Sequence, residues 1–318
     1  MTEDHTILQD FIGESGKQLP VIETASEKDM AIWVRTHLKE IEKILLTYGG
    51  VLLRNFGLYS VSEFNKVAQV VCPNLFDYIY RSTPRTRLGG KIYTATEYPP
   101  EKTIPQHNEN AYSKNWPSKI IFGSILVAEE GGETPIADSR RVYKKIPIPI
   151  REAFEEKGVL YVRNYRPNVD LSWQEVFQTE DRKEVEIYCE DNGIEYEWNK
   201  GNADLTTKQV CQASIIHPET KEKVWFNQAH LFHITGLEKK ERESLIKEFG
   251  EEGLPRNTFY GDGSPFDPKD LDLIREIYEE EKVVFPWQRG DVMVLDNRLM
   301  THGRNSFKGP RKVVVAMG

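Results

Sequence analysis

The chain has 318 residues with 42 basic and 50 acidic side chains, and its net charge of −8 argues against nucleic acid or an anionic membrane as the main partner. No apolar run approaches the roughly 20 residues that cross a bilayer, and the acidic N-terminus lacks the basic start and apolar centre of a signal peptide. Three cysteines without a CxxC pair indicate neither a disulfide framework nor a zinc cluster. We therefore expect a soluble protein of the reducing cytoplasm.

The N-terminal part of the chain predicts two helices around one short strand. Apolar residues recur at helical spacing across residues 28–48, and Gly49 follows where a helix C-cap is expected. The apolar run at 51–57 predicts a buried strand. A second helix over 60–72 begins with Ser60, a residue type that caps helix N-termini.

From about residue 90 the chain consists mostly of short β-branched and aromatic runs separated by Gly, Pro and Asn. Helix-like acidic segments interrupt these runs near 238–249 and 268–282. Many short strands favour a β-sandwich or jelly roll with helical insertions, and the lack of a linker favours a single domain over residues 1–318. The expected strands are 91–96, 119–128, 158–165, 223–228, 282–287, 291–297 and 311–317.

Two HxE triplets are candidates for metal ligands, although about one such triplet is expected by chance in a chain of this composition. His107 and Glu109 precede an apolar run, and residues i and i+2 of a strand point to the same face, so both could reach one ion. In the other triplet, Pro218 separates His217 from Glu219 in a segment typical of a hairpin turn. The first triplet is therefore the better candidate.

A third ligand is expected on a distant strand, and His302 follows the apolar run 291–295. Two histidines and one carboxylate, with the other positions open, form the metal site of non-haem Fe(II) oxygenases. Arg311 opens the next apolar strand, where its planar fork could hold a dicarboxylate whose other end chelates the metal. Taken singly, these two residues are also explained as a strand-end histidine and a surface arginine. Their order and spacing together favour the metal site.

Five separated motifs resemble the taurine dioxygenase-like (TauD/TfdA) family of Fe(II)/2-oxoglutarate-dependent oxygenases. Within that family the likeness is greatest to amino-acid hydroxylases of nonribosomal peptide pathways, such as the syringomycin-type aspartyl hydroxylase, and it extends from about residue 50 to 318. The motifs are HNENAY (107–112), GGETPIADSRRVY (131–143), GVLYVRNY (158–165), VWFNQAH (224–230) and VLDNRLMTHGRNSFKGPRKVVVAM (294–317).

The resemblance implies a mainly β fold with α additions, namely a double-stranded β-helix (jelly roll) of the clavaminate synthase-like type. We expect one oxygenase domain with an N-terminal helical segment at 1–49 and a core from about 50 to 318. A helical insertion is expected at about 236–282.

The resemblance also implies a cofactor and site residues. Fe(II) is the expected cofactor, with 2-oxoglutarate and O2 as co-substrates. His107, Glu109 and His302 match the family's metal ligands. Arg311 and Thr134 match the residues that bind the distal carboxylate of 2-oxoglutarate.

The implied reaction is hydroxylation of an unactivated C–H bond in a small polar substrate. Related halogenases carry a small residue in place of the ligand carboxylate, so Glu109 favours hydroxylation. The taurine enzyme has a second arginine at the position of Val315, which argues against a sulfonate substrate. We expect an amino acid, free or tethered to a carrier protein, in secondary metabolism such as antibiotic biosynthesis. The alternatives are desaturation or cyclisation with the same cofactors, or a non-catalytic jelly-roll binding protein.

Four residues are candidates for contacts with the substrate. Asn227, Gln228 and His230 lie in a segment that the resemblance places at the barrel mouth, and Arg163 could add a basic wall for a carboxylate. The alternative for the first three is that they satisfy backbone groups of a hairpin. An acidic carrier protein would need a basic docking surface, and the candidate residues are Lys114, Lys119, Arg140, Arg141, Lys144 and Lys145. Scattered solvated charges on the surface explain these residues equally well.

Overall fold

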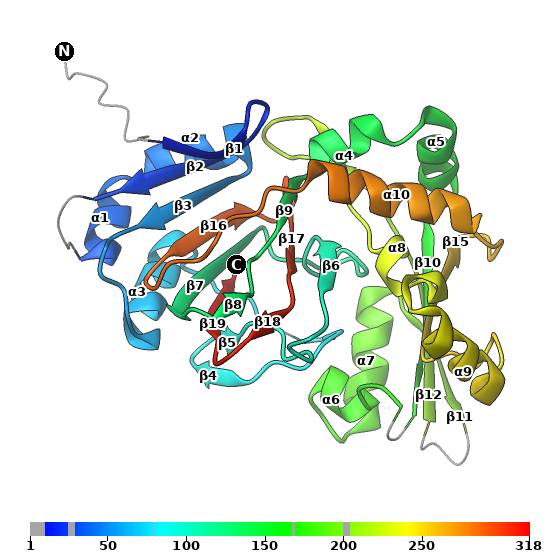
Figure 1. The fold of residues 1–318 in the computed structure, drawn as a ribbon. Coiled ribbons are helices and arrows are strands. Elements are labelled where there is room, and N and C mark those ends of the chain that lie inside the picture. Colours follow the sequence, from blue (N-terminus) through cyan, green and yellow to red (C-terminus); the bar gives the residue numbers. More distant parts are fainter. Residues whose placement is uncertain (1–9, 25–28, 78, 167–168, 200–203) are drawn as a thin grey trace.

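An eight-stranded sheet forms the centre of the fold in the computed structural model, which describes residues 10–24, 29–77, 79–166, 169–199 and 204–318 (Figure 1). Neighbouring strands run antiparallel except β2 and β3, which are parallel. In spatial order the strands are β1 (Asp10–Glu14), β2 (Lys17–Glu23), β3 (Gly50–Arg54), β16 (Val292–Asp296), β7 (Lys119–Leu126), β19 (Lys312–Met317), β5 (Ile92–Thr94) and β4 (Arg87–Gly89).

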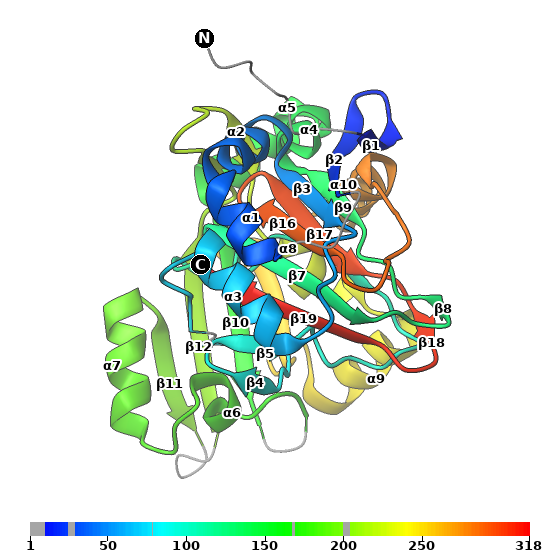
Figure 2. The same cartoon turned by 90° about the vertical axis from the view of Figure 1, so that its left-hand side faces the viewer.

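The central sheet is buried on both faces, as the alternation along β19 shows. Val313, Val315 and Met317 belong to one apolar core, whereas Val314 and Ala316 belong to a second core on the opposite face. Burial on both faces explains why the sequence of β19 is an unbroken apolar run rather than an alternating one. The helices that cover the second core (Figure 2) are α1 (Met30–Thr36), α2 (Leu38–Tyr48) and α3 (Val61–Val71).

A smaller three-stranded sheet packs on the first core and completes the jelly roll. Phe122 of the central sheet and Met300 of the small sheet share this core. The predicted double-stranded β-helix is confirmed. The strands of the small sheet, and the short pair that flanks it, are β6 (Ile104–His107), β17 (Met300–Arg304), β9 (Ile136–Asp138), β18 (Phe307–Lys308) and β8 (Glu130–Gly131).

A four-stranded antiparallel sheet forms a second region, on the right of Figure 1. Burial alternates along its strand β12, where Leu205 and Thr207 are buried and Lys208 is exposed, as expected for a sheet covered on one face. Its spatial order is β11 (Glu195–Asn199), β12 (Asp204–Cys211), β10 (Val159–Tyr165) and β15 (Arg256–Tyr260). The remaining elements are α4 (Ser139–Lys145), α5 (Ile148–Lys157), α6 (Trp173–Phe177), α7 (Arg182–Asn192), β13 (Ser214–Ile216), β14 (Lys223–Trp225), α8 (Ala229–Phe232), η2 (Ile234–Gly236), α9 (Lys239–Phe249) and α10 (Pro268–Glu281). None of the described helices is long and apolar enough to span a membrane.

Local signals predicted several helix ends correctly. Ser60 caps α3 in a capping box with Glu63, and Asp267 caps α10 ahead of its first-turn proline. Gly49 ends α2 in the left-handed conformation, with φ of 78°. These ends depend on contacts between residues close in sequence, which is why the sequence alone predicts them.

The helix predicted over residues 28–48 forms as two helices. Lys28 lies outside the described residues, and α1 and α2 are separated at His37, which leaves the helical conformation. The ring of His37 stacks on Trp33 at a centroid distance of 4.2 Å. A segment whose apolar spacing predicts one continuous helix is thus divided at His37.

Several elements differ from the expectations. The N-terminal segment expected to be helical also contains the β1–β2 hairpin, helices α4 to α7 lie where strands or loops are expected, and the segment 236–282 contains strand β15 as well as helices. Residues 282–287 alternate between exposed and buried, but the described bridge there joins Val283 to Ile136 alone. Burial that alternates from residue to residue predicts an extended backbone. The hydrogen bonds of a sheet also require a neighbouring strand, which this alternation does not reveal.

Candidate metal and co-substrate site

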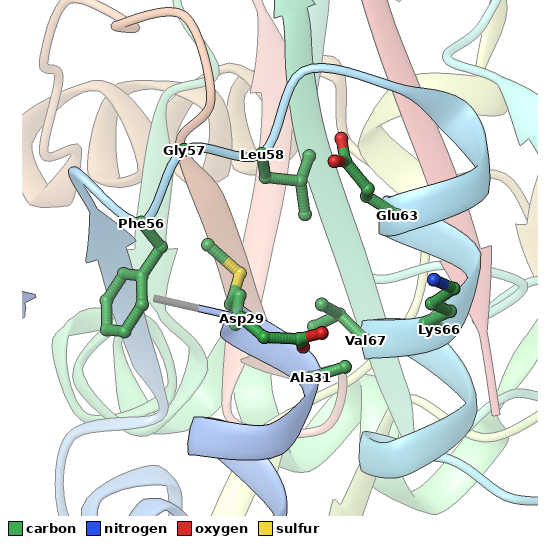
Figure 3. A pocket seen from close by; sticks show the side chains of 9 residues that line it. Asp29, Ala31, Phe56, Gly57, Leu58, Glu63, Lys66 and Val67 are labelled. Atoms are coloured by element: carbon green, nitrogen blue, oxygen red, sulfur yellow. The ribbon is translucent and has the colours of Figure 1, made fainter. Parts of the chain in front are cut away.

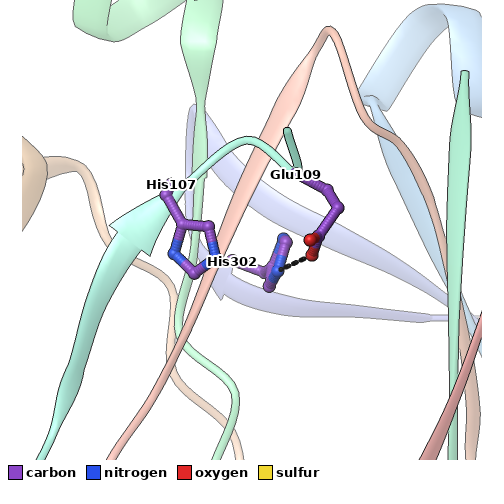
Figure 4. Close-up of side chains that lie close together, drawn as sticks. All are labelled: His107, Glu109 and His302. Atoms are coloured by element: carbon purple, nitrogen blue, oxygen red, sulfur yellow. Dashed lines mark ion pairs between the residues drawn. The ribbon is translucent and has the colours of Figure 1, made fainter. Parts of the chain in front are cut away.

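Two histidines that are far apart in the sequence face each other across the small sheet. His107 ends β6 and His302 lies at the centre of β17, and the two residues are direct partners in the antiparallel register. Cross-strand partners present their side chains on the same face of a sheet. Their ring centroids are 4.5 Å apart (Figure 4). The strand register therefore brings together two imidazoles that the sequence separates.

Glu109 joins the histidines from the segment just after β6, and Asn297 holds it in place. The backbone N–H of Glu109 donates to Oδ1 of Asn297 at 2.7 Å, and Nδ2 of Asn297 donates back to the Glu109 carbonyl at 3.0 Å. Asn108 points away from the histidines, as the alternation predicts, and donates to the Asn297 carbonyl at 2.7 Å. The side-chain amide of Asn297 thus replaces the strand neighbour that this segment lacks.

The three side chains form a donor set that fits a divalent metal ion. One ligand atom from each of His107, Glu109 and His302 can be chosen so that all three lie within 4.8 Å of one another. Nδ1 of His107 lies 2.8 Å from the Pro105 carbonyl, so it carries the proton and leaves Nε2 as a free lone pair. Nδ1 of His302 is buried and finds no hydrogen-bond partner among the described residues. Two imidazoles and a carboxylate are the ligands of the facial triad.

Electrostatics keep His107 and Glu109 in the protonation states that a metal requires. Burial, and then the neighbouring His302, lowers the pKa of His107 to about 4, so its imidazole is neutral at pH 7. Burial alone would raise the pKa of Glu109, but the Arg85 guanidinium and the two histidines outweigh burial and hold this pKa well below its usual range. Metal binding needs a neutral imidazole and an ionised carboxylate.

Arg85 lies directly beside the triad. Its Nη2 is 2.7 Å from Oε2 of Glu109, and the same oxygen is 3.4 Å from Nε2 of His302. Arg85 and Glu109 are both buried. The carboxylate is therefore shared between a cation and an imidazole in a place closed to bulk water.

A small pocket opens beside the histidines. No acidic residue is among the described residues that line it, although it contains three arginines. Its lining consists of Arg85, Ala95, Thr96, Ile104, His107, Phe122, Thr134, His302, Gly303, Arg304 and Arg311.

Arg311 is held at one end of this pocket by a glycine turn. Its Nε donates to the Gly132 carbonyl at 3.0 Å, and its guanidinium lies over the Phe307 ring. Gly132 has φ of +77°, and a Cβ there would lie 3.0 Å from both Cδ and Nε of Arg311. Burial, and then the positive charge of Arg304, lowers the pKa of Arg311 to about 10. Within the described part of the chain no carboxylate forms an ion pair with Arg311, so this half-buried cation suits an anionic ligand.

Thr134 also lines the pocket, and Trp287 orients its hydroxyl. The indole Nε1–H of Trp287 donates to Oγ1 of Thr134 at 3.1 Å. Because an indole nitrogen can only donate, Oγ1 is the acceptor, and the hydroxyl proton of Thr134 remains available to a ligand.

The four residues expected to contact the substrate are placed elsewhere. Asn227, Gln228, His230 and Arg163 are buried, and none of the four is among the residues that line the pocket. Gln228 donates to the Asn108 carbonyl at 2.7 Å, and Nε2 of His230 lies 3.0 Å from the Gln106 carbonyl. The amide of Gln228 thus contacts a backbone carbonyl, which is the kind of contact that the alternative for this segment describes.

Asn227 and Arg163 support the backbone in the same way. Nδ2 of Asn227 donates to the Ala213 carbonyl at 2.7 Å. Arg163 lies in the four-stranded sheet, over the ring of Tyr165, and donates to the Arg81 carbonyl at 3.1 Å. Sequence adjacency to a family motif placed these residues near the mouth, whereas their described side-chain contacts are with backbone carbonyls and, for Arg163, with the Tyr165 ring.

Most of the basic residues expected to dock a carrier protein are neutralised. On α4, Arg140 pairs with Asp138 at 2.7 Å, and Lys145 pairs with Glu281 at 2.7 Å. Arg141 also pairs with Glu281. This face therefore carries less free positive charge than its sequence suggests.

Three residues of the site escaped the sequence analysis. Asn297 follows a buried strand within one of the family motifs, so its sequence position marked it as a candidate site residue. Arg85 and Trp287 lie outside recognised motifs, and their contacts with Glu109 and Thr134 join residues distant in the sequence. No local pattern could have found those two.

A second hollow, of about 410 Å³, lies between α1 and α3 on the opposite side of the central sheet (Figure 3). Asp29 lines it and caps α1, and Glu63 lines it and completes the capping box of α3. Phe56 and Val67 supply apolar walls. Its carboxylates hold helix ends, so imperfect helix packing accounts for this hollow.

Comparison with known proteins identifies the group to which this fold and site belong. The family model described as taurine catabolism dioxygenase TauD, TfdA family, matches residues 15–317. The chain is 42% identical to the dapdiamide synthesis protein DdaC of Enterobacter agglomerans, over 92% of this chain and 89% of that protein. It is 33% identical to a clavaminate synthase-like protein of Arabidopsis thaliana, over 89% and 86%.

Solved structures share the fold at low sequence identity. The PvcB protein of Pseudomonas aeruginosa matches with a TM-score of 0.56 and 12% identity, covering 100% of this chain and 92% of that one. A taurine dioxygenase of Burkholderia xenovorans matches with a TM-score of 0.50 and 16% identity, covering 98% and 88%.

Proposed function

Because the chain belongs to the TauD/TfdA family of dioxygenases, which use Fe(II), 2-oxoglutarate and O2, we propose that His107, Glu109 and His302 hold the iron. The observation that carries this assignment is the convergence of their ligand atoms within 4.8 Å from two strands of one small sheet. The neutral state of His107 and the ionised state of Glu109 support it. When bound, the iron and 2-oxoglutarate supply an oxidation coupled to decarboxylation to succinate.

Arg311 and Thr134 are the proposed contacts for the distal carboxylate of 2-oxoglutarate. The half-buried Arg311 lines the pocket and has no carboxylate partner among the described residues. The hydroxyl proton of Thr134 is available because Trp287 donates to its oxygen. A buried fork and a directed hydroxyl together suit a carboxylate of fixed orientation. The protein residues thus bind and orient the co-substrate and keep water from the reacting centre.

The proposed reaction is hydroxylation of an unactivated C–H bond in a small polar substrate, with an amino acid as the best candidate. A role in secondary metabolism is supported by the 42% identical relative, whose name assigns it to dapdiamide synthesis. The buried thiols of the three cysteines, all unpaired, fit a cytoplasmic location. Desaturation or cyclisation would use the same groups, and product mass separates them, because hydroxylation adds one oxygen and desaturation removes two hydrogens.

The substrate is proposed to bind either free or tethered to a carrier protein. The basic residues of α4 are paired with carboxylates, so they lend tethering little support.

A non-catalytic binding protein would not need both histidines, the carboxylate and Arg311 together. The retention of all four favours the enzyme.

The first experiment adds Fe(II) to metal-free protein without oxygen, then 2-oxoglutarate, and follows the visible charge-transfer band of the complex. We expect a band in the parent protein that His107→Ala and Arg311→Ala both weaken. Arg289→Ala, which removes an exposed arginine away from the pocket lining, should leave the band unchanged. A folded, iron-loaded parent protein without a band would contradict the proposed co-substrate site.

A further inference from the structure

The histidine of the second HxE triplet, His217, has no part in the proposed iron site, yet it is buried. Its backbone closes the turn between β13 and β14: its N–H donates to the Glu222 carbonyl at 2.8 Å, and its carbonyl accepts from the Lys221 N–H at 3.0 Å. Its ring instead contacts Asp296, the last residue of β16, which lies 79 residues further along the chain. The ring of His217 therefore joins two segments that the sequence separates.

Hydrogen bonds on both ring nitrogens fix the tautomer of His217. The backbone N–H groups of Glu219 and Thr220 lie 3.3 and 3.1 Å from Nδ1. A backbone N–H can only donate, so Nδ1 is the acceptor and the ring proton lies on Nε2. Nε2 is 3.1 Å from Oδ2 of Asp296, so this N–H donates to the carboxylate. The turn thus aims the ring donor of His217 at Asp296.

The carboxylate of Asp296 in turn holds the connection between β16 and β17. Its Oδ1 accepts from the backbone N–H groups of Arg298 and Leu299 at 2.8 and 3.2 Å. Asp296 is buried, so its other oxygen needs a donor from the protein, and His217 supplies one. The connection leads directly into β17, on which His302 lies. One carboxylate therefore links His217 to the segment that carries a proposed metal ligand.

The same connection also places Glu109. Asn297, which follows Asp296, exchanges two hydrogen bonds with the backbone of Glu109. The segment 217–228 meets the backbone beside this ligand a second time, because Gln228 donates to the Asn108 carbonyl at 2.7 Å. The segment thus reaches the neighbourhood of Glu109 both directly and through the β16–β17 connection.

We propose that His217 is a positioning residue for the iron site, acting through Asp296 and the connection that carries Asn297. This inference rests on the proposed function, because it assumes that Glu109 and His302 hold the iron. Without the imidazole N–H, Oδ2 of a buried carboxylate loses its donor, and the connection is no longer held from that side. Metal sites require their ligands to stay within about 0.5 Å of the productive geometry. Loss of an outer partner typically lowers metal affinity about 10–100-fold.

The test measures the Mn(II) affinity of the full-length protein by calorimetric titration and the electron paramagnetic resonance spectrum of the bound ion. His217→Phe fills the space of the ring without its N–H, and we expect the affinity to fall about tenfold and the zero-field splitting to change. A residue that only fills space would show neither effect. His217→Gln keeps an N–H donor and should recover most of the affinity.

Asp296→Asn breaks the same contact from the other side. The amide oxygen is needed by the backbone N–H groups of Arg298 and Leu299, so the amide NH2 group faces the Nε2–H of His217, whose tautomer is fixed. We expect a similar loss of Mn(II) affinity, and this variant keeps the test open should His217→Phe not fold. In an Asn297→Ala background, His217→Phe should cause little further loss, because the path to Glu109 is already broken.

The matched control is Asp291→Asn, which removes a buried carboxylate at the other end of β16 that pairs with Arg54. It should destabilise the fold and leave the Mn(II) affinity of the folded protein unchanged. If the parent does not bind Mn(II), or His107→Ala binds it equally well, the proposed iron site itself is wrong. If the parent binds Mn(II) and folded His217→Phe matches its affinity and spectrum, the site stands and the positioning role is overturned. An equal loss in Asp291→Asn overturns it too, since general destabilisation would then explain the effect.

Discussion

Two buried arginine–carboxylate pairs among the described residues lie in regions with different consequences. Arg54, the last residue of β3, and Asp291, just before β16, form a two-bonded fork, with Nε–Oδ1 at 2.9 Å and Nη2–Oδ2 at 2.7 Å. The backbone of Gln288 adds a third hydrogen bond to the same carboxylate. Arg85 and Glu109 share one described contact, beside two histidines and an open pocket.

The difference shows that burial and pairing do not by themselves reveal a functional charge. In the Arg54–Asp291 pair each side chain satisfies the other, so the pair serves as a structural clamp. In the Arg85–Glu109 pair the carboxylate has a second neighbour, His302, and both Arg85 and His302 line the pocket. A pair whose carboxylate can exchange its arginine partner for a metal ion is suited to metal binding.

The largest expected effect comes from breaking the clamp. Asp291→Asn leaves the Arg54 charge buried without a counter-charge, and we expect it to reduce the free energy of unfolding by about 3–5 kcal/mol. Urea denaturation should show the same loss in metal-free and Mn(II)-loaded protein. Arg85→Gln should destabilise the metal-free protein but have much less effect once Mn(II) is bound to Glu109. An equal loss in both states for Arg85→Gln would remove the distinction between the two pairs.

Replacing the Glu109 carboxylate should have its main effect on metal binding. Glu109→Gln removes an anionic ligand, and we expect Mn(II) affinity to fall more than about 100-fold. The backbone of this segment stays anchored by Asn297, so the fold should persist. Glu130→Gln, at an exposed carboxylate paired with Lys308, is the control. Calorimetric titration with Mn(II) measures both variants, and unchanged affinity in Glu109→Gln would exclude this carboxylate as a ligand.

A buried histidine outside the proposed metal site extends the comparison. Nε2 of His230 contacts the Gln106 carbonyl, and His230 is not one of the proposed metal ligands. Burial lowers the pKa of His230 to about 3, against about 6.5 in the unfolded chain. Between these values the unfolded state binds the extra proton, so stability falls as the pH drops from 7 towards 3. We expect this residue to account for a loss of about 2 kcal/mol between pH 7 and pH 5. Urea denaturation at both pH values should show that His230→Gln has a flatter pH dependence, and an unchanged dependence would refute this assignment.

The smallest expected effect concerns the placement of Arg311. Gly132→Ala puts a Cβ against Cδ and Nε of Arg311 in a backbone conformation that disfavours alanine. We expect the KM for 2-oxoglutarate to rise about tenfold, with a smaller change in kcat. Gly263→Ala, at a position with positive φ and open space around it, carries a similar backbone cost without the contact. A similar KM in both variants would mean that the turn does not position the arginine.

Local patterns predicted those parts of the fold that depend on residues close in sequence. The caps at Ser60 and Gly49 are examples, because each depends on hydrogen bonds within one turn of helix. The same reasoning missed the β1–β2 hairpin and helices α4 to α7, and it predicted a ladder strand at 282–287. Strand pairing and helix docking depend on neighbours that no local window contains.

The sequence by itself determined the residue types of the site. The HxE spacing, the later histidine and the arginine at the start of the last strand identified His107, His302 and Arg311, which line one pocket, and Glu109, which lies beside the two histidines. Only the tertiary structure decided which other groups join them. The His302–His107 register, the amide of Asn297 against Glu109 and the guanidinium of Arg85 on the same carboxylate are contacts across long sequence separations. These contacts form because two sheets pack against one core, and a sequence pattern does not specify which strands become neighbours.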